Sequence, residues 1–200
     1  MVSKLLLAAQ ETFFRAVDSG ASRPILQKLA ECYYDIRSGI GDYKSPSEYG
    51  AFPMDPYSHT PAHAGARQPG LTGQVKEDIL CRMGEMGIFV KDGQIHFLPA
   101  LLRREEFLSE PASFHYYDLT GSARCLRLQP GSLAYTCCQV PVIYRLGRQN
   151  SLRIFFNGKP TILCKELRLD AVTSQFIFNR TGRVSRIVVT LSERKDFCHE

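Results

Sequence analysis

The polar side chains best suited to chemistry gather in one stretch of the sequence, between residues 55 and 74. The members with carboxylate, phenol, imidazole, guanidinium or amide groups are Asp55, Tyr57, His59, Arg67, Gln68 and Gln74. Groups of these types make directional hydrogen bonds to several hydroxyls at once, and an aromatic ring can cover a C–H surface. The stretch therefore predicts a binding site for a polyhydroxylated ligand such as a sugar. The alternative is that these groups only satisfy the backbone of a long loop.

Two further patterns could support acid–base or metal chemistry. Asp78 and Glu85 share one face of a predicted helix and could form an acid–base pair, although charged residues on a helix face are more commonly solvated. His59 and His63 have a metal-like spacing, but Pro61 lies between them and opposes a helix. Because no third ligand follows in the sequence, no metal site is predicted.

The sequence lacks the common motifs for reactive thiols, nucleophilic serines and nucleotide binding, so motifs give little indication of an enzyme. Seven cysteines occur without a C-x-x-C pair, and the adjacent Cys137 and Cys138 fall in a strand pattern, where buried thiols are usually inert. The odd number favours reduced cysteines and a cytoplasmic protein. P-loop, G-x-S-x-G and G-x-G-x-x-G motifs do not occur, so no cofactor is expected.

The elements before and after the polar stretch are predicted to be helices. Apolar residues at helical spacing predict helices over 3–18 and 24–36, with Gly20 as a left-handed cap and Ser22 as an amino-terminal cap. A third helix is expected from residue 72. Residues 37–71 form a long loop rich in glycine, proline and tyrosine, and its aromatic residues favour an ordered loop. Free backbone N–H groups in the first turn of the third helix would also favour an anion such as phosphate.

The rest of the chain has the short alternating runs that are typical of β-structure. Asp92-Gly93 predicts a tight hairpin between two short strands, and Asn157-Gly158 predicts another. The predicted strands cover residues 88–90, 94–97, 113–117, 125–128, 133–146, 152–156, 161–169, 176–179 and 184–191. The fold expected is α+β, with a helical segment over residues 1–110 and an antiparallel β-sandwich over residues 111–200.

Charge is divided unevenly between these two segments. Residues 1–110 hold 12 basic and 14 acidic residues, a net charge of −2, whereas residues 111–200 hold 13 basic and 6 acidic residues, a net charge of +7. The second segment could attract a polyanion or an acidic protein surface, or its arginines could simply be solvated. No apolar run approaches the length of a membrane span, so the protein is expected to be soluble.

Three segments resemble a known family. They are Ser38-Gly39-Ile40-Gly41, Tyr49-Gly50-Ala51-Phe52-Pro53 and Gly70-Leu71-Thr72-Gly73-Gln74-Val75. Together with the order of elements, they resemble the end of the catalytic chain in six-hairpin glycosidases, such as cellobiose- and chitobiose-phosphorylase-like bacterial enzymes. The resemblance implies that the helices belong to an α/α barrel and that the chain is the carboxyl-terminal part of a glycoside hydrolase or phosphorylase.

This resemblance leaves several points open. It identifies no catalytic residue, and three helices cannot build a six-hairpin barrel, so the rest would lie in a missing amino-terminal portion or in another copy. The alternative is a non-catalytic module that binds a glycan or a protein through a basic sheet face. The arginines expected on that face are Arg145, Arg148, Arg153, Arg168, Arg183 and Arg186. Nucleic-acid binding by the same arginines is less favoured, because no RNA- or DNA-binding motif occurs.

Overall fold

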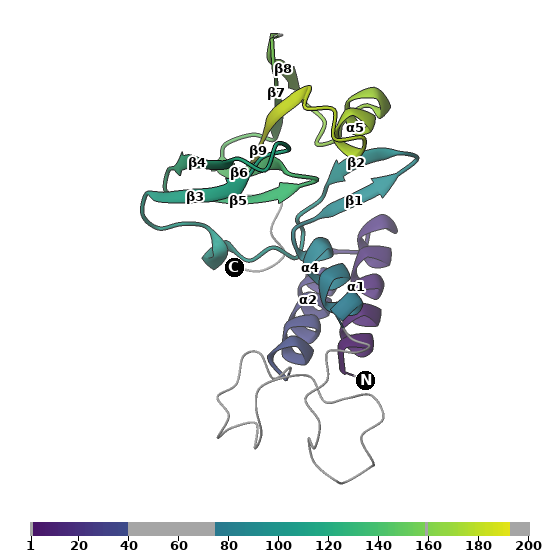
Figure 1. Cartoon of the computed structure of the whole chain (residues 1–200). Coiled ribbons are helices and arrows are strands. Elements are labelled where there is room, and N and C mark those ends of the chain that lie inside the picture. Colours follow the sequence, from purple (N-terminus) through teal and green to yellow (C-terminus); the bar gives the residue numbers. More distant parts are fainter. Residues whose placement is uncertain (1, 40–74, 159, 193–200) are drawn as a thin grey trace. The chain divides into compact units, whose positions relative to one another are not determined.

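The computed structural model describes residues 2–39, 75–158 and 160–192 (Figure 1). They belong to two compact units, a helical unit that ends at Glu85 and a β unit that begins at Met86. The described residues contain four α-helices and both antiparallel and parallel strand pairs, so the fold is α+β, as predicted. No helix within them is long and apolar enough to cross a membrane.

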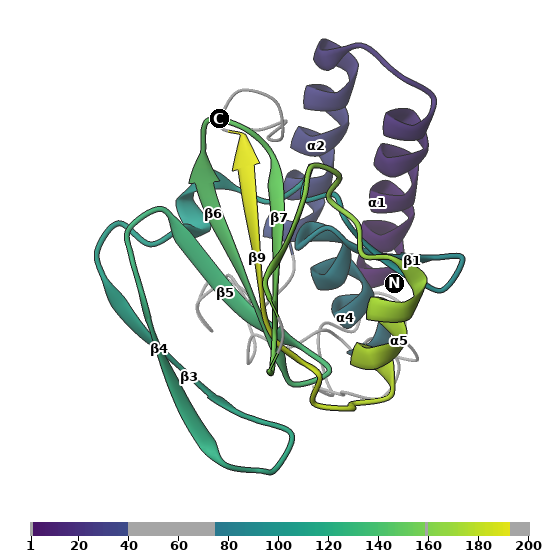
Figure 2. The same cartoon turned by 90° about the horizontal axis from the view of Figure 1, so that it is seen from above.

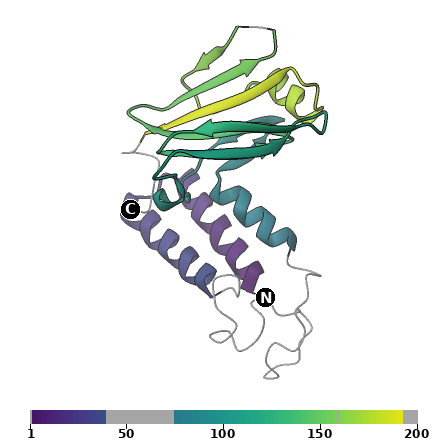
Figure 3. The same cartoon turned by 60° about the vertical axis from the view of Figure 1, so that its left-hand side comes forward.

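The helical unit consists of α1 (Val2–Asp18), α2 (Arg23–Ser38) and α4 (Val75–Glu85) (Figure 3). Gly20 has a φ of +71°, its N–H donates to the carbonyl of Val17, and the next N–H donates to Ala16, which confirms the predicted left-handed cap. Ser22 occupies the amino-terminal cap position of α2, but its side chain makes no capping hydrogen bond. Pro at the start of α2 needs no N–H partner, which is why the helix begins there.

Helix α1 contacts both other helices of this unit. Its buried face includes Leu6 and Phe13, and Gln10 lies between them in the sequence. The Gln10 amide donates to the carbonyl of Cys81 at 2.7 Å, and a Cβ on Gly84 would stand only 2.1 Å from the Gln10 side chain. Glycine at position 84 therefore lets α4 approach α1 closely enough for this hydrogen bond to form.

The β unit is built around a mixed five-stranded sheet. Its strand order is β5-β6-β9-β7-β8, and Figure 2 shows β9 lying between β6 and β7. The strands are β5 (Ser132–Cys137), β6 (Val140–Gly147), β7 (Ser151–Phe156), β8 (Ile162–Cys164) and β9 (Val184–Ser192). β9 pairs in parallel with β6 and antiparallel with β7. Two separate hairpins accompany the sheet, β1 (Ile88–Lys91) with β2 (Gln94–Phe97), and β3 (Ala112–Tyr117) with β4 (Ala123–Leu128).

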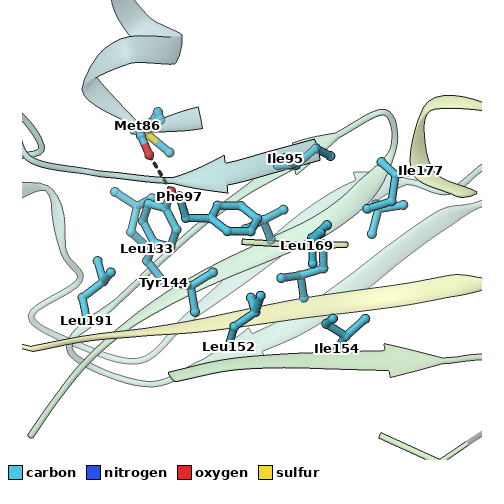
Figure 4. Close-up of a cluster of buried hydrophobic side chains, with 14 of the residues drawn as sticks. Met86, Ile95, Phe97, Leu133, Tyr144, Leu152, Ile154, Leu169, Ile177 and Leu191 are labelled. Carbon is cyan, nitrogen blue, oxygen red and sulfur yellow. Dashed lines mark hydrogen bonds between the residues drawn. The ribbon is translucent and has the colours of Figure 1, made fainter. Parts of the chain in front are cut away.

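The two faces of this sheet pack against different elements. The inner face holds Tyr144, Leu152 and Ile187, which pack with residues of the β1–β2 hairpin and α5 (Ala171–Phe178). Figure 4 shows this cluster, in which the hydroxyl of Tyr144 donates to the backbone carbonyl of Met86. The outer face holds Ile143 and Val188, which pack with residues of the β3–β4 hairpin. Both faces carry a packed element, so apolar side chains occur on both sides of the central strands, although the outer face also holds arginines.

The segment predicted as the strand 176–179 is a helix, and this prediction is wrong. α5 begins after Asp170, whose carboxylate accepts hydrogen bonds from the N–H and the hydroxyl of Thr173 at 2.7 and 2.9 Å. This cap outweighs the strand preference of the phenylalanines near position 177. The helix links β8 to β9 and allows β9 to run parallel to β6.

The long strand predicted over 133–146 is also wrong, because it is two strands joined by a turn at Cys138-Gln139. The φ values of these residues are +48° and +66°, so the turn is of the tight type that favours glycine and asparagine. Cys138 lies in this turn, whereas Cys137 ends β5. The predicted strand 161–169 is shorter than expected, and β8 ends at Cys164.

The boundary between the units lies after Glu85, whereas the composition predicted one near residue 110. The reason is packing, because Ile95 and Phe97 of the first hairpin and Leu102 and Phe107 of the following connector all belong to the core of the β unit. The predicted hairpin itself is confirmed, with Asp92 and Gly93 at positive φ in its turn.

Candidate functional site

The substrate-binding residues predicted from the sequence lie outside the residues that the structure describes. This applies to all of Asp55, Tyr57, His59, Arg67, Gln68 and Gln74, and to His63 of the metal-like pair. The structure therefore does not test whether these side chains lie together.

The proposed acid–base pair of α4 can be examined directly. The Glu85 side chain is only 1% exposed, and its carboxylate lies 2.6 Å from Arg37 and 2.8 Å from Arg82. The Tyr33 hydroxyl donates a third bond to it at 2.6 Å. Two guanidinium groups and a phenol thus surround this carboxylate, so Glu85 links the ends of α2 and α4. Asp78 is half-buried and lies two turns away.

The Glu85 carboxylate acts on the buried groups around it. Burial and the Glu85 charge raise the pKa of Tyr33 far above its usual range, and they raise the pKa of the Cys81 thiol to about 12. In the β unit, burial and the neighbouring Cys138 raise the pKa of Cys137 to about 12. Neither thiol can form a thiolate near neutral pH, which agrees with the sequence-based interpretation of Cys137 as an inert cysteine.

Glu77 of α4 is a buried carboxylate that the sequence did not single out. It is 4% exposed, and its Oε2 has no hydrogen-bond partner among the described residues. Its position in the first turn of α4 places it near the positive end of the helix dipole, which favours a negative charge. One helix thus holds a carboxylate with three partners near its end and, near its start, a buried carboxylate whose Oε2 has no partner among the described residues.

An open hollow of about 450 Å³ lies in the β unit, where loops from four strands converge. We call it the polar hollow, and define it by its polar lining residues Tyr116, Asp118, Arg124, Gln139, Asn157 and Ser185. The first three belong to the β3–β4 hairpin, and the others lie in the β5–β6 turn, after β7 and at the start of β9. Residues far apart in the sequence therefore contribute to one concave surface.

Asp118 organises one side of the polar hollow. Its Oδ1 accepts hydrogen bonds from the N–H and hydroxyl of Thr120 at 2.9 and 2.6 Å and from the N–H of Ser122 at 3.0 Å, and its Oδ2 accepts from Nε of Arg124 at 2.7 Å. The Thr120 hydroxyl and the Arg124 guanidinium hold the pKa of Asp118 well below its usual range. Asp118 is therefore ionised at neutral pH and has no proton to donate as a general acid.

Gln139, Asn157 and Arg124 are each held by one side-chain hydrogen bond and keep further polar atoms free, whereas Tyr116 is held by ring stacking. The Gln139 amide donates to the carbonyl of Asp118 at 3.1 Å, and the Asn157 amide donates to the carbonyl of Gly182 at 2.8 Å. Within the described part of the chain, Oε1 of Gln139, Oδ1 of Asn157, the Tyr116 hydroxyl and the Nη groups of Arg124 have no hydrogen-bond partner. The Tyr116 ring stacks on Phe114, with centroids 5.7 Å apart.

This arrangement offers two donor groups and two acceptor groups on side chains that are already oriented. Such a set matches a ligand with several adjacent hydroxyls, because each hydroxyl both donates and accepts. Fixing the side chains beforehand also reduces the entropy lost on binding. The polar hollow is therefore suited to binding a polyol.

A second hollow of about 430 Å³ lies near the start of α5, beside Cys164 and Lys165. Its main charged groups are already engaged, since Arg168 pairs with Glu166 at 2.6 Å and Asp170 caps α5. It offers fewer free groups than the polar hollow.

The arginines predicted to form one basic face are divided among different places. Strand alternation and register put Arg145, Arg153 and Arg186 on the outer face of the sheet, next to residues such as Val188. Arg183 lies over the ring of Phe176 of α5 at 4.5 Å, and Arg168 pairs with Glu166. The prediction that all of these arginines share one basic face is therefore wrong.

Sequence reasoning missed the polar hollow because its residues come from separate turns and strand ends that meet only in the folded protein. Asp118 and Thr120 have the spacing of an Asx turn, a signal that could have been found, and Asn157 was recognised only as a hairpin residue. Gln139 had no signal, because Cys-Gln is an unusual pair for a tight turn.

Among the described residues, no group of three or more histidine, cysteine or acidic side chains could hold a metal ion. No protein-family model matches this chain, and no curated protein sequence matches it.

Proposed function

We propose that this chain is a carbohydrate-binding protein whose β unit holds a saccharide in the polar hollow. The observation that supports it is the set of free polar atoms on Tyr116, Arg124, Gln139 and Asn157, each oriented by contacts that are already made. The polar stretch between residues 55 and 74 suggests the same ligand class from the sequence. The lowered pKa of Asp118 makes this carboxylate unsuited to a general-acid role, so the proposal is limited to binding.

Saccharide binding can be measured by thermal shift and calorimetry with a panel of mono- and oligosaccharides. A ligand that binds only the folded state raises its apparent stability. Tyr116→Phe removes only the free hydroxyl, and we expect it to weaken binding several-fold without loss of stability. Tyr117→Phe is the matched control, because Tyr117 is 68% exposed and points to the other face of the same strand.

Variants of the polar stretch distinguish the two candidate sites. If Tyr57→Phe and His59→Ala abolish binding while Tyr116→Phe leaves it unchanged, the saccharide binds to the polar stretch and the role of the polar hollow is refuted. If no saccharide in the panel binds a folded sample, the proposed function is refuted.

A finer proposal concerns the whole protein, as the carboxyl-terminal part of a glycoside hydrolase or phosphorylase. Its helical unit would belong to an α/α barrel, and the β3–β4 hairpin on the five-stranded sheet would form the second layer of a sandwich. Apolar side chains on one side of α4 support the barrel, because Ile79, Leu80 and Met83 are between 40% and 55% exposed. Such a stripe is suited to packing against apolar helices.

The stripe can be tested on the purified chain. We expect Leu80→Gln with Met83→Gln to reduce self-association in sedimentation experiments without lowering helicity, since exposed side chains contribute little to the core. A monomeric wild-type chain at high concentration would count against the barrel.

The free cysteines of the described residues are compatible with a cytoplasmic location, which we include in this proposal.

A further inference from the structure

Arg186 of β9 is a half-buried arginine that has no anionic partner among the described residues. Its guanidinium lies 4.3 Å from the centroid of the Phe155 ring, the residue directly opposite on β7. Its Nε is buried and has no hydrogen-bond partner within the described residues. Arg124 and Arg168, by contrast, each pair with a carboxylate.

An unpaired guanidinium in this position is costly. Removing a charged group from water is unfavourable unless hydrogen bonds or an opposite charge replace the lost hydration. The aromatic ring compensates one face of the guanidinium, but it accepts no in-plane hydrogen bond from the N–H groups. Nε is buried, so the Nη groups are the part of the guanidinium that an acceptor from outside the described residues can reach.

Arg186 lies next to the polar hollow. It follows Ser185, which lines the hollow, and it precedes Ile187, which pairs with Val142. Pro141, which precedes Val142, also lines the hollow. Because β6 and β9 run in parallel, Pro141 and Arg186 occupy neighbouring positions on the outer face.

The described charged residues in and beside the hollow have a net positive charge. Asp118 is the carboxylate in its lining, and Arg124 neutralises it. Arg186 then adds a charge that no described acidic side chain pairs with, and Nη groups of Arg124 remain free. The segment 111–200 as a whole has a net charge of +7, from 13 basic and 6 acidic residues.

We propose that the polar hollow selects an acidic saccharide, one with a carboxylate or phosphate group that Arg186, beside the hollow, binds while the lining side chains bind the sugar hydroxyls. This inference rests on the proposed saccharide site. Guanidinium groups form strong, charge-assisted hydrogen bonds with both kinds of anion.

The experiment compares matched ligands by calorimetry on the full chain. The pairs are galacturonate with galactose, glucuronate with glucose, and glucose 6-phosphate with glucose, together with inorganic phosphate alone. We expect at least one acidic member to bind about tenfold more tightly than its neutral counterpart, with an advantage that falls as salt increases. Comparing uronates with the sugar phosphate identifies which anion is preferred.

Two variants test the role of Arg186. Arg186→Met keeps an unbranched side chain over Phe155, and we expect it to abolish the preference for the acidic sugar. Arg153→Met is the matched control on the same outer face, and it should keep the preference. Circular dichroism checks that both are folded; if Arg186→Met is not, Arg186→Lys takes its place and should reduce the preference.

The outcomes separate this inference from the proposed function. Equal binding of acidic and neutral sugars, or a preference that survives in folded Arg186→Met, overturns the inference and leaves the saccharide site intact. Binding of inorganic phosphate as tightly as glucose 6-phosphate also overturns it, because the sugar would then contribute nothing. Binding of no saccharide overturns both.

Discussion

At the scale of single residues, Glu85 is the clearest structural anchor. Replacing it by Gln leaves Arg37 and Arg82 beside a neutral group and turns one of the two acceptor oxygens into an NH2 group that faces donors. Because breaking one partner of a buried ion pair leaves uncompensated charge, we expect Glu85→Gln to lower the free energy of unfolding by about 3 kcal/mol. Urea denaturation followed by circular dichroism at 222 nm would measure it.

The control for Glu85 is an acidic residue on an exposed helix surface. Glu31 of α2 is exposed, and Glu31→Gln should change the free energy of unfolding by less than about 0.5 kcal/mol. Tyr33→Phe should have an intermediate effect of about 1–2 kcal/mol, since it removes one hydrogen bond to a charged group. Similar stabilities for Glu85→Gln and Glu31→Gln would contradict the role assigned to the buried carboxylate.

Cysteine reactivity follows from burial and from the raised pKa values. Cys81 and Cys137 have pKa values of about 12, so at pH 7.5 almost none of either thiol is ionised. We expect iodoacetamide to modify the exposed Cys32 and Cys125 at least ten times faster, as measured by peptide mass spectrometry. In urea all seven cysteines should react at similar rates. Fast modification of Cys81 in the folded protein would show that its surroundings differ from those described.

At the scale of elements, the sequence predicted correctly those helices and hairpins whose signals lie within a few neighbouring residues. Apolar spacing and Gly20 identified α1 and α2, and Asp92-Gly93 identified the first hairpin, because these signals depend on neighbouring residues alone. The turn at Cys138-Gln139 could not be recognised, since its residues rarely adopt positive φ and apolar side chains occur on both faces of β5. The sheet imposes that turn through the pairing of β5 with β6.

The turn between β5 and β6 should therefore be unfavourable locally. A left-handed residue with a side chain costs roughly 1–2 kcal/mol, which glycine avoids in part. We expect Gln139→Gly to raise the free energy of unfolding by about 0.5 kcal/mol and to weaken saccharide binding, because it removes the amide from the polar hollow. Asp92→Asn, in a turn that already contains Gly93, is the control and should change neither quantity. Stronger saccharide binding by Gln139→Gly would contradict the role given to this side chain.

Asp118, in the turn between β3 and β4, should make the stability of the folded state depend on pH. The folded state lowers the pKa of Asp118 below its ordinary value of 3.8, so its contribution is complete above that value and is lost as the pH falls toward the lowered pKa. We expect the wild-type protein to lose stability below about pH 4 more steeply than Asp118→Asn, which should be less stable at neutral pH. Thermal unfolding between pH 2 and 7 would measure it, and Asp92→Asn controls for the loss of one negative charge. Parallel curves for wild type and Asp118→Asn would refute the prediction.

At the scale of the whole molecule, the sequence indicated α+β but not how the β elements assemble. The position of β9 between β6 and β7 depends on pairs more than 30 residues apart, such as Leu152 with Val189, and no local pattern encodes such a pairing. The helix α5 was missed for a different reason, because its apolar residues fit a strand and the local capping signal of Asp170 was not recognised. The polar hollow combines residues from distant segments, so a search for polar residues clustered in the sequence found the stretch 55–74 instead.

The division into two units predicts that stability and binding can be separated. The core of the β unit includes the first hairpin and the connector that follows it, from Met86 onward, so a fragment of residues 86–192 contains the complete cluster around Tyr144. We expect this fragment to fold cooperatively and to bind the same saccharide with an affinity within about threefold of that of the full chain, because the polar hollow lies wholly within it. In the full chain, Glu85→Gln should increase amide exchange in α2 and α4 while leaving saccharide affinity unchanged. A folded fragment that no longer binds would move the site to residues 40–74 or to the helical unit.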